Sequence, residues 1–216
     1  MNSAETSCHI EASGLHYSYP GGTKMSFPDL CFGRGEHWLI TGSSGSGKTT
    51  LLHLLAGLRQ PDGGKVSVNG NNLADMRRAE LDRFRGREIG IVFQTSHFVQ
   101  SLNVLENLEL AAFLAGKKTD KARNKNLLDR LGLKHKGGKK PHQLSVGEQQ
   151  RASIARAMVN RPSVVLADEP TASLDDENCR KMIELLRQEC SESNATLITV
   201  THDQRVKELI QKVVAL

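Results

Sequence analysis

The chain has 216 residues, which is long enough for one large domain, or one domain with an added lobe, to bury most of its apolar surface. Aromatic residues make up only 4% of it and charged residues 25%, and no run approaches the ~18 to 20 apolar residues that cross a bilayer, so the composition excludes a membrane-spanning class. The formal net charge is +5, but the densest basic patch, Lys134 to Lys140, has no interleaved aromatic residues. We therefore expect a solvated loop there and no nucleic-acid partner, with anionic lipid headgroups as the alternative.

The amino terminus and the cysteines predict a reducing compartment. The first residues lack the basic start and the apolar core of a signal peptide, which favours a cytoplasmic location. Four cysteines, Cys8, Cys31, Cys179 and Cys190, are scattered without C-x-x-C spacing. We expect neither a zinc site nor a disulfide framework, and four buried free thiols instead.

Apolar periodicity and turn residues predict an α/β fold with an inserted helical part. Short strands of an antiparallel layer are expected at 8–19 and 64–69. Strands of a mostly parallel core are expected at 36–41, 89–93, 163–168, 196–201 and 212–216, with helices near 48–57 and 176–191. Helical patterns at Val104–Ala115, Lys121–Leu131 and Val146–Asn160 follow one another without a strand signal. Residues 95–160 are therefore predicted to form a helical lobe between the two parts of the core, 1–94 and 161–216.

A phosphate-binding loop follows the first core strand. Residues 42–49 read G-S-S-G-S-G-K-T, which satisfies G-x-x-x-x-G-K-[ST] at every fixed position. The glycines let the backbone turn its N–H groups inward, and the helix beginning near Lys48 adds a positive dipole end. Lys48 is expected to reach the β and γ phosphates and Thr49 to ligate Mg²⁺. The candidate phosphate-binding residues are Gly42, Ser43, Ser44, Gly45, Ser46, Gly47, Lys48, Thr49 and Thr50.

Two adjacent carboxylates end a later strand. The apolar run that starts at Val164 is typical of a buried parallel strand, which delivers Asp168 and Glu169 to the carboxyl edge of the sheet. Asp168 is expected to hold Mg²⁺, directly or through water. Glu169 is expected to orient or deprotonate the water that attacks the γ phosphate. The alternative, an acidic capping turn before Pro170, explains one acid better than two.

Polar residues also follow the other core strands. Gln94 comes after 89–93, where its amide could contact both Mg²⁺ and the attacking water. His202 comes after 196–201, where an imidazole could donate to the γ phosphate, although a capping or surface histidine is the alternative. The loop of Ser173, Leu174 and Asp175 follows the twin acids and could communicate with a neighbouring site.

The segment Leu144 to Arg151, L-S-V-G-E-Q-Q-R, is a second candidate phosphate site. Ser145 is placed to cap the helix that follows, and Gly147 permits close approach of an anion to the helix end. The segment has no lysine, so it should complete a phosphate site rather than form one alone. An ordinary capping box with Glu148 is the other interpretation, and both can hold in the free subunit. Glu148 is unfavourable near an anion unless Arg151, three residues on, partners it.

Taken in their order along the chain, the six segments resemble the nucleotide-binding subunit of ATP-binding cassette (ABC) proteins, from Tyr19 to the final strand. Val146 and Glu148 depart from the usual glycine and glutamine of the family's signature segment. The resemblance implies a P-loop NTPase core of the RecA type that binds and hydrolyses ATP with Mg²⁺. It also implies a head-to-tail dimer, in which Ser145 and Gly147 of one copy face the γ phosphate held by the other. Glu148 and Asp175 belong to the same candidate set.

The resemblance also indicates where the base and a membrane partner bind. Tyr19 matches the family's adenine-stacking aromatic residue best, with Tyr17 as the rival, because both would share one face of a strand. In transporter members, a helix of the membrane subunit enters the groove beside the Gln94 loop, which Val99 to Glu106 would line here.

The phrases R-G-R-E-I-G-I-V-F-Q and L-E-N-L-E-L are most similar to the subgroup that serves lipoprotein release, macrolide export and cell division. The prediction is an ATPase that powers a membrane transporter, of the export or lipoprotein-release type, from the cytoplasmic face of the membrane. An importer ATPase, a cell-division clamp or another non-transport cassette are the alternatives. A small-molecule P-loop kinase leaves Leu144 to Arg151 unexplained.

Overall fold

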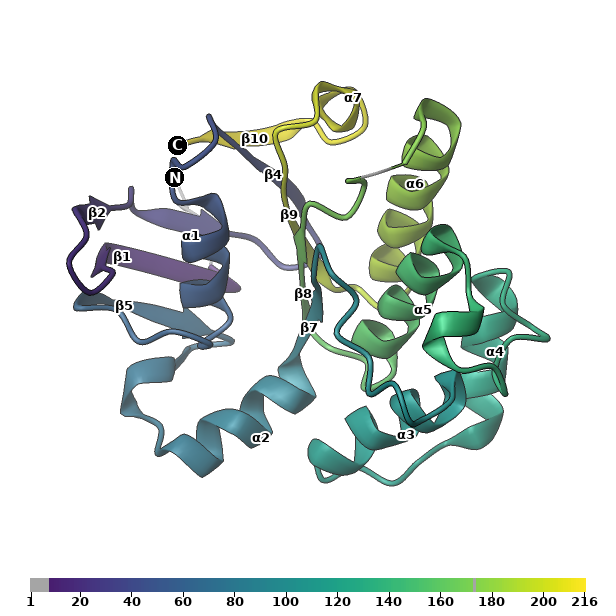
Figure 1. Ribbon diagram of the computed structural model, residues 1–216. Coiled ribbons are helices and arrows are strands. Elements are labelled where there is room, and N and C mark those ends of the chain that lie inside the picture. Colours follow the sequence, from purple (N-terminus) through teal and green to yellow (C-terminus); the bar gives the residue numbers. More distant parts are fainter. Residues whose placement is uncertain (1–7, 173) are drawn as a thin grey trace, which may run out of the picture.

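Two sheets with helices between and beside them form the protein, whose computed structural model describes residues 8–172 and 174–216 (Figure 1). The core sheet is parallel throughout and has the strand order β10-β4-β9-β8-β7. Its strands are β4 (His37–Thr41), β7 (Ile89–Val92), β8 (Val164–Asp168), β9 (Thr196–Val200) and β10 (Lys212–Ala215). All five were predicted, and no strand end differs by more than one residue.

The second sheet is antiparallel and centres on the longest strand, β1. Its strands are β1 (Ile10–Ser18), β2 (Lys24–Ser26), β3 (Leu30–Phe32), β5 (Gly63–Val68) and β6 (Asn71–Asn72). β1 pairs with β2, β3 and β5, and its pairing with β5 has a register shift between Ser13 and His16. The sequence predicted β1 and β5 only, because strands of two or three residues are too short to show an alternating pattern.

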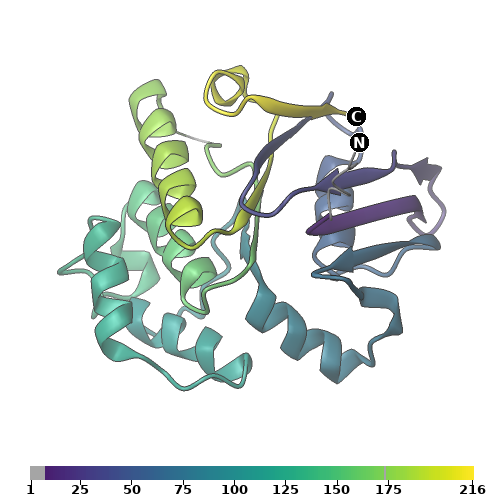
Figure 2. The ribbon, with the colours of Figure 1, turned by 180° about the vertical axis from the view of Figure 1, so that it is seen from behind.

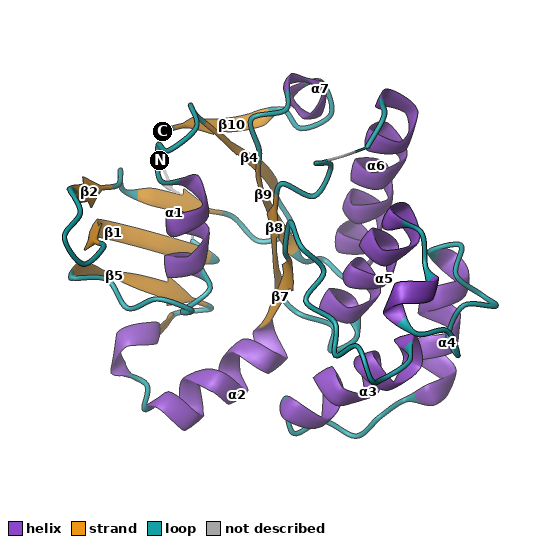
Figure 3. Ribbon diagram, viewed as in Figure 1, coloured by secondary structure: helices purple, strands orange, loops and turns teal. Residues whose placement is uncertain are grey.

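Helices cover both faces of the parallel sheet (Figures 2 and 3). They are α1 (Lys48–Leu55), α2 (Arg78–Glu88), α3 (Val104–Leu114), α4 (Lys121–Arg130), α5 (Val146–Met158), α6 (Asp176–Glu192) and α7 (Gln204–Lys207), with 3₁₀ turns at Leu73–Asp75 and Pro141–Gln143. Helix α2 was not predicted. Its sequence has no wide apolar stripe, which is the pattern that would predict a helix, and none of its residues is buried.

The alternating side chains of β8 show how the core is divided. Val164 and Leu166 pack in the cluster that contains the leucines of α1 and the inner face of the antiparallel sheet. Val165 and Ala167 pack in the cluster formed with α3, α4, α5 and α6. Because both faces of the strand are covered, its sequence is apolar without interruption. The same burial forces polar residues out to the end of the strand.

The parallel direction brings the candidate functional residues to one edge. The loop from 42 to 47 follows β4, Gln94 follows β7, Glu169 follows β8 and His202 follows β9. Asp168 is paired in register with Val200, so the residues after these two strands are also neighbours. The predicted α/β fold, with its parallel core and antiparallel layer, is confirmed.

The expectation of four free thiols is wrong for two of the cysteines. Cys8 and Cys31 form a disulfide with a Cα–Cα distance of 5.2 Å. Antiparallel pairing of β1 with β3 places Glu11 opposite Cys31, which brings the segment before β1 close to β3. Sequence spacing cannot show this pairing, because the two cysteines lie 23 residues apart with no motif. Cys179 and Cys190 are free and buried, as predicted.

We expect the Cys8–Cys31 bond to stabilise the folded chain, because it closes a loop in the unfolded chain. Replacement by Cys31→Ser should lower the free energy of unfolding by about 3 kcal/mol, measured by urea titration of the oxidised protein. A reductant should lower the melting temperature of the wild type and leave that of Cys31→Ser unchanged. Equal melting temperatures for oxidised and reduced wild type would contradict the expectation.

Candidate active site

A cavity of about 980 Å³ opens at the carboxyl edge of the parallel sheet. The predicted site residues that line it are Tyr19, Gly42, Ser43, Ser44, Gly45, Gly47, Lys48, Thr49, Thr50, Gln94, Glu169 and His202. Thr23, Met25, Gln204 and Lys207 also line it, and sequence reasoning missed them because they belong to no motif. The cavity therefore collects residues from four separate strand ends and from the segment after β1.

The loop between β4 and α1 has the backbone that a bound phosphate needs. Gly45 and Gly47 have φ values of 79° and 93°, which other residues adopt only with strain. A Cβ atom at Gly47 would also lie 3.1 Å from the Phe27 ring, which would have to shift to make room for a side chain. Gly47 immediately precedes α1, which directs the positive end of the helix dipole toward the loop.

The polar atoms of the loop fit an anion. Lys48 is 8% exposed, and its ammonium group donates to the carbonyls of Gly42 (3.0 Å) and Ser43 (2.7 Å). An ammonium group has three donors, so one remains for a ligand. The Ser46 hydroxyl is buried and has no hydrogen-bond partner among the described residues. A phosphate group would supply acceptors for both.

Thr49 and Asp168 place a hydroxyl and a carboxylate oxygen next to each other beside the loop. The Thr49 hydroxyl donates to Oδ1 of Asp168 at 3.1 Å, although 119 residues separate them. Asp168 is 5% exposed, and burial raises the pKa of its carboxyl group despite the Thr49 hydrogen bond. Hydroxyl and carboxylate oxygens suit Mg²⁺, which usually takes few protein ligands and completes its shell with phosphate and water. When bound, Mg²⁺ would neutralise part of the phosphate charge. Gln94 is exposed and lines the same cavity as Thr49.

Glu169 and His202 are in direct contact. Oε1 of Glu169 accepts from the backbone N–H of His202 (3.2 Å) and lies 2.7 Å from its ring Nδ1. Glu169 has a φ of 45°, an uncommon conformation for a residue with a side chain. When Nδ1 donates to the carboxylate, Nε2 can donate to a phosphate only if the imidazole is protonated. The predicted role of His202 therefore depends on its protonation state.

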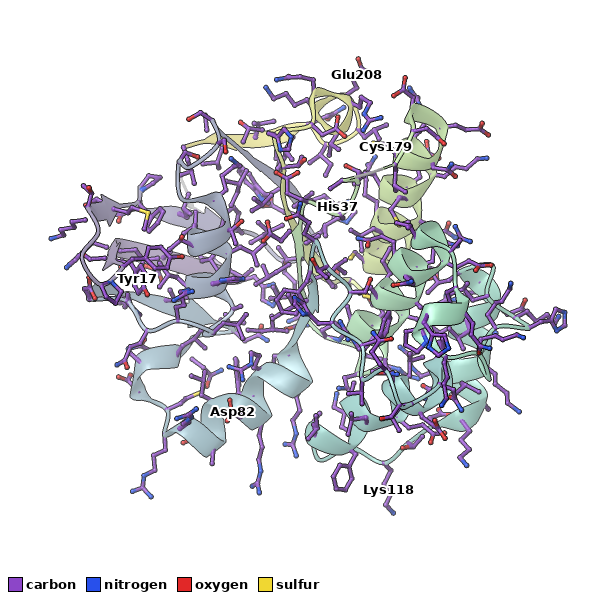
Figure 4. All side chains as sticks on the ribbon, viewed as in Figure 1. Tyr17, His37, Asp82, Lys118, Cys179 and Glu208 are labelled. Carbon is purple, nitrogen blue, oxygen red and sulfur yellow. A yellow bond between two sulfur atoms is a disulfide. The ribbon has the colours of Figure 1, made fainter. Side chains whose placement is uncertain are left out.

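Tyr19 rather than Tyr17 reaches the cavity. Tyr19 is 40% exposed, its hydroxyl is 3.1 Å from that of Thr50, and the Arg59 guanidinium carbon lies 4.8 Å from the centroid of its ring. Tyr17 lies among the strands of the antiparallel sheet (Figure 4), where its hydroxyl accepts from Arg59 at 2.9 Å. Tyr17 does not belong to the described lining of the cavity.

Leu144 to Arg151 lies away from this cavity. Ser145 caps α5 by accepting from the backbone N–H of Glu148, whose carboxylate accepts from that of Ser145, so the predicted capping box is present. Among the described residues, the cavity lining includes neither Ser145 nor Gly147. Gly147 borders a separate hollow of about 300 Å³ between α4, α5 and α6. Asp175 caps α6 by accepting from Asn178, and Ser173 lies outside the described residues.

The salt-bridge partner of Glu148 is Lys136 rather than Arg151. Its carboxylate pairs with Lys136 at 3.0 Å, and Arg151 makes no salt bridge with it within the described chain. The backbone N–H of Ser145 and the Lys136 ammonium hold the pKa of Glu148 below its usual value, while Arg151 contributes only through its charge. Lys136 belongs to the basic loop 134–140, so part of that loop is paired rather than free.

Asp203 and Arg205 form an ion pair just after His202. The carboxylate of Asp203 accepts from Nε (2.9 Å) and Nη2 (2.7 Å) of Arg205 and caps α7 by accepting from the Arg205 backbone N–H. These contacts lower the pKa of Asp203 to about 2. Arg205 also donates to Asp176 at 2.6 Å. No sequence motif predicts this pair.

A parallel sheet with a glycine-rich loop after one strand and acids after another defines a P-loop nucleoside triphosphatase. Within this class, the family model described as "ABC transporter" matches residues 27–172. The chain therefore belongs to the ABC transporter family, and it is an ATPase that uses ATP with Mg²⁺.

Relatives share most of the chain. The lipoprotein-releasing system ATP-binding protein LolD of Bacteroides fragilis (strain YCH46) is 37% identical over 207 residues, which cover 95% of this chain and 96% of LolD. The macrolide export ATP-binding/permease protein MacB of Shewanella sp. (strain W3-18-1) is 39% identical over 95% of this chain but only 32% of MacB. The solved dimer of the ATP-binding cassette MJ0796 in a post-hydrolysis state, bound to ADP and Pi, is 32% identical with a TM-score of 0.87, covering 96% of this chain and 94% of MJ0796. No helix in the described residues is both long and apolar enough to cross a membrane.

The lowered pKa of Asp203 predicts a pH-dependent contribution to stability. Because its pKa is lower in the folded protein, about 2 against 3.8, the contribution is present above pH 3.8 and is lost as the pH falls toward 2. Asp203→Asn should therefore lower the melting temperature most above about pH 4, with a difference from wild type that shrinks between about pH 4 and 2. The exposed Glu208 in the same region (Figure 4) provides the control Glu208→Gln. A difference that is constant with pH would show that the charge of Asp203 contributes nothing.

Proposed function

We propose that this chain is the ATP-hydrolysing subunit of a membrane transporter of the lipoprotein-release or macrolide-export type, and that two copies close head to tail around two ATP molecules. One observation carries the dimer: the cavity holds the phosphate loop and Glu169, whereas the capped end of α5 lies on another part of the surface. Each subunit then offers two unlike halves of a phosphate site. The dimeric MJ0796 structures support pairing of two copies.

The exposed end of α5 has the properties of the second half. Ser145 and Val146 are exposed, and a Cβ atom at Gly147 would meet nothing nearer than Arg151 Nη1 at 3.6 Å, so the surface is open to an approaching ligand. The helix end favours an anion, but the segment has no lysine to bind one tightly. Across a dimer interface, Ser145 and Gly147 would contact the γ phosphate held by Lys48 of the other copy. Asp175, at the start of α6, would lie near the same interface.

The residues of the cavity divide the chemistry between them. The phosphate loop and Lys48 hold the phosphates, Thr49 and Asp168 hold Mg²⁺ with Gln94, and Tyr19 stacks on the base. Glu169 receives a hydrogen bond from the attacking water and orients it. His202 contacts the γ phosphate while its Nδ1 stays on Glu169. Hydrolysis therefore requires the Glu169 carboxylate to stay at the cavity wall, within reach of the attacking water.

The helical part gives the subunit a way to act on a partner. We divide the single domain into a core, 1–94 and 161–216, and a helical lobe, 95–160, that carries α3, α4 and α5. Val99 is 43% exposed beside the Gln94 segment, where the face from Val99 to Glu106 would receive a helix of the membrane subunit. The relatives LolD and MacB, named for lipoprotein release and macrolide export, support such a partner. The subunit would then work as a peripheral protein on the cytoplasmic face of the membrane.

Glu169→Gln should stop hydrolysis while leaving ATP binding intact, because an amide keeps the size of the side chain but cannot accept a proton from water. Turnover should fall by at least about 100-fold, and Mg-ATP should produce a dimer in size-exclusion chromatography. Glu177→Gln, which removes an exposed acid of α6, should behave as wild type. A Glu169→Gln protein that hydrolyses ATP at the wild-type rate would contradict the role of Glu169.

Mixing two inactive variants tests the composite site. Lys48→Ala removes the phosphate ligand, and Gly147→Asp places a negative charge at the α5 end, where the free subunit has room for the new side chain. Each variant should be inactive alone. A 1:1 mixture should recover up to about a quarter of wild-type turnover, because half of the dimers contain one intact site of two. A mixture that dimerises yet stays inactive would contradict the head-to-tail arrangement.

A further inference from the structure

Thr201, the residue after β9, is fully buried and links two groups beside the cavity. Its hydroxyl accepts from the backbone N–H of Asp203 at 3.0 Å and lies 2.6 Å from Oε2 of Glu169. The amide N–H can only donate, so the single hydroxyl hydrogen is left for the carboxylate. This makes the contact with Glu169 a charge-assisted hydrogen bond of fixed direction.

The contact matters because Glu169 needs to be held. Its φ of 45° is an uncommon conformation, and its backbone N–H donates to the carbonyl of Val200 at 2.8 Å. The side chain has three hydrogen bonds, one from Thr201 and two from His202. The His202 side chain is 73% exposed and is free to turn toward a ligand, whereas Thr201 is enclosed. Of the two side chains on this carboxylate, Thr201 is therefore the fixed one.

The segment that orients Thr201 is itself fixed on both sides. The Asp203 carboxylate is held by Arg205 and also accepts from the hydroxyl of Thr171, a fully buried residue just after Glu169. Arg205 donates to the carbonyl of Leu174 (3.2 Å) as well as to Asp176. Cys179, in the first turns of α6, faces this region near α7 (Figure 4) and lies 3.7 Å from Asp203. The Asp203 backbone N–H, which directs the Thr201 hydroxyl, is thus held in place by contacts with the start of α6.

We propose that Thr201 is a positioning residue of the ATPase: its hydroxyl holds the Glu169 carboxylate in the orientation that receives the attacking water, and the Asp203–Arg205 pair holds Thr201. The proposal rests on the proposed function of Glu169. Hydrolysis therefore depends on a buried hydroxyl that touches neither nucleotide nor metal. Binding of ATP does not depend on it, since Thr201 is absent from the described cavity lining.

Three variants separate this role from simple packing. Thr201→Val keeps the shape and removes the donor, and it should lower kcat by about tenfold while KM for ATP changes by less than about twofold. Thr201→Ser keeps the hydroxyl and should retain most of the turnover. Thr199→Val is the matched control, because the Thr199 hydroxyl is buried on the same strand and has no hydrogen-bond partner among the described residues. It should hydrolyse ATP as wild type does.

A double variant identifies the residue through which Thr201 acts. In single-turnover assays, Thr201→Val should reduce the rate in the wild-type background but add nothing in the Glu169→Gln background, because the two residues act as a unit. If Thr201→Val melts too low for comparison, Thr201→Cys replaces it, since a thiol of similar size is a weak donor.

The outcomes distinguish the two proposals. Turnover of Thr201→Val equal to that of Thr199→Val, with Glu169→Gln inactive, would overturn the positioning role and leave the role of Glu169 standing. An equal loss in both backgrounds would also overturn it, because the effect would then be structural. A fully active Glu169→Gln would overturn the proposed function and this inference with it.

Discussion

Parallel pairing of strands buried on both faces is the constraint on which the site depends. Helices cover both faces of the sheet, so the strands β7 and β8 are apolar up to their ends, and the acids and the amide of the site appear where these strands stop. Since the strands run in the same direction, those ends meet at one edge. Because Asp168 pairs with Val200, the next residue, Glu169, lies beside Thr201 and His202 and forms hydrogen bonds with both.

The sequence predicted the elements that have a continuous apolar pattern or a motif of known spacing. The five parallel strands, the longer antiparallel strands and the phosphate loop are continuous patterns, and the structure places Gln94, Glu169 and His202 around one cavity. It did not predict α2, whose residues all remain unburied, or the bond between Cys8 and Cys31, which depends on strand pairing. The partner of Glu148 was missed for the same reason, because Lys136 is close only after the chain has folded.

The residues around Glu169 illustrate a general limit of motif reading. A motif marks the side chains that touch a ligand, but the groups that hold those side chains are ordinary residues such as Thr201 and Arg205. Thr201 matters because it is buried and its hydrogen bonds have a fixed direction. Its hydroxyl accepts from the Asp203 N–H, so its own hydrogen can only be donated to the Glu169 carboxylate. Such groups become visible only in three dimensions, because nothing in their spacing differs from that of a neighbour such as Thr199.

The stacking of Arg59 on Tyr19 has a consequence for the choice of nucleotide. With the guanidinium at 4.8 Å on the ring, Tyr19 is held as a flat surface before any base arrives, which lowers the entropy cost of stacking. A flat surface accepts any flat base, because stacking reads area and not hydrogen-bonding pattern. If Tyr19 stacks on the base as proposed, discrimination between bases at this end of the site would be weak.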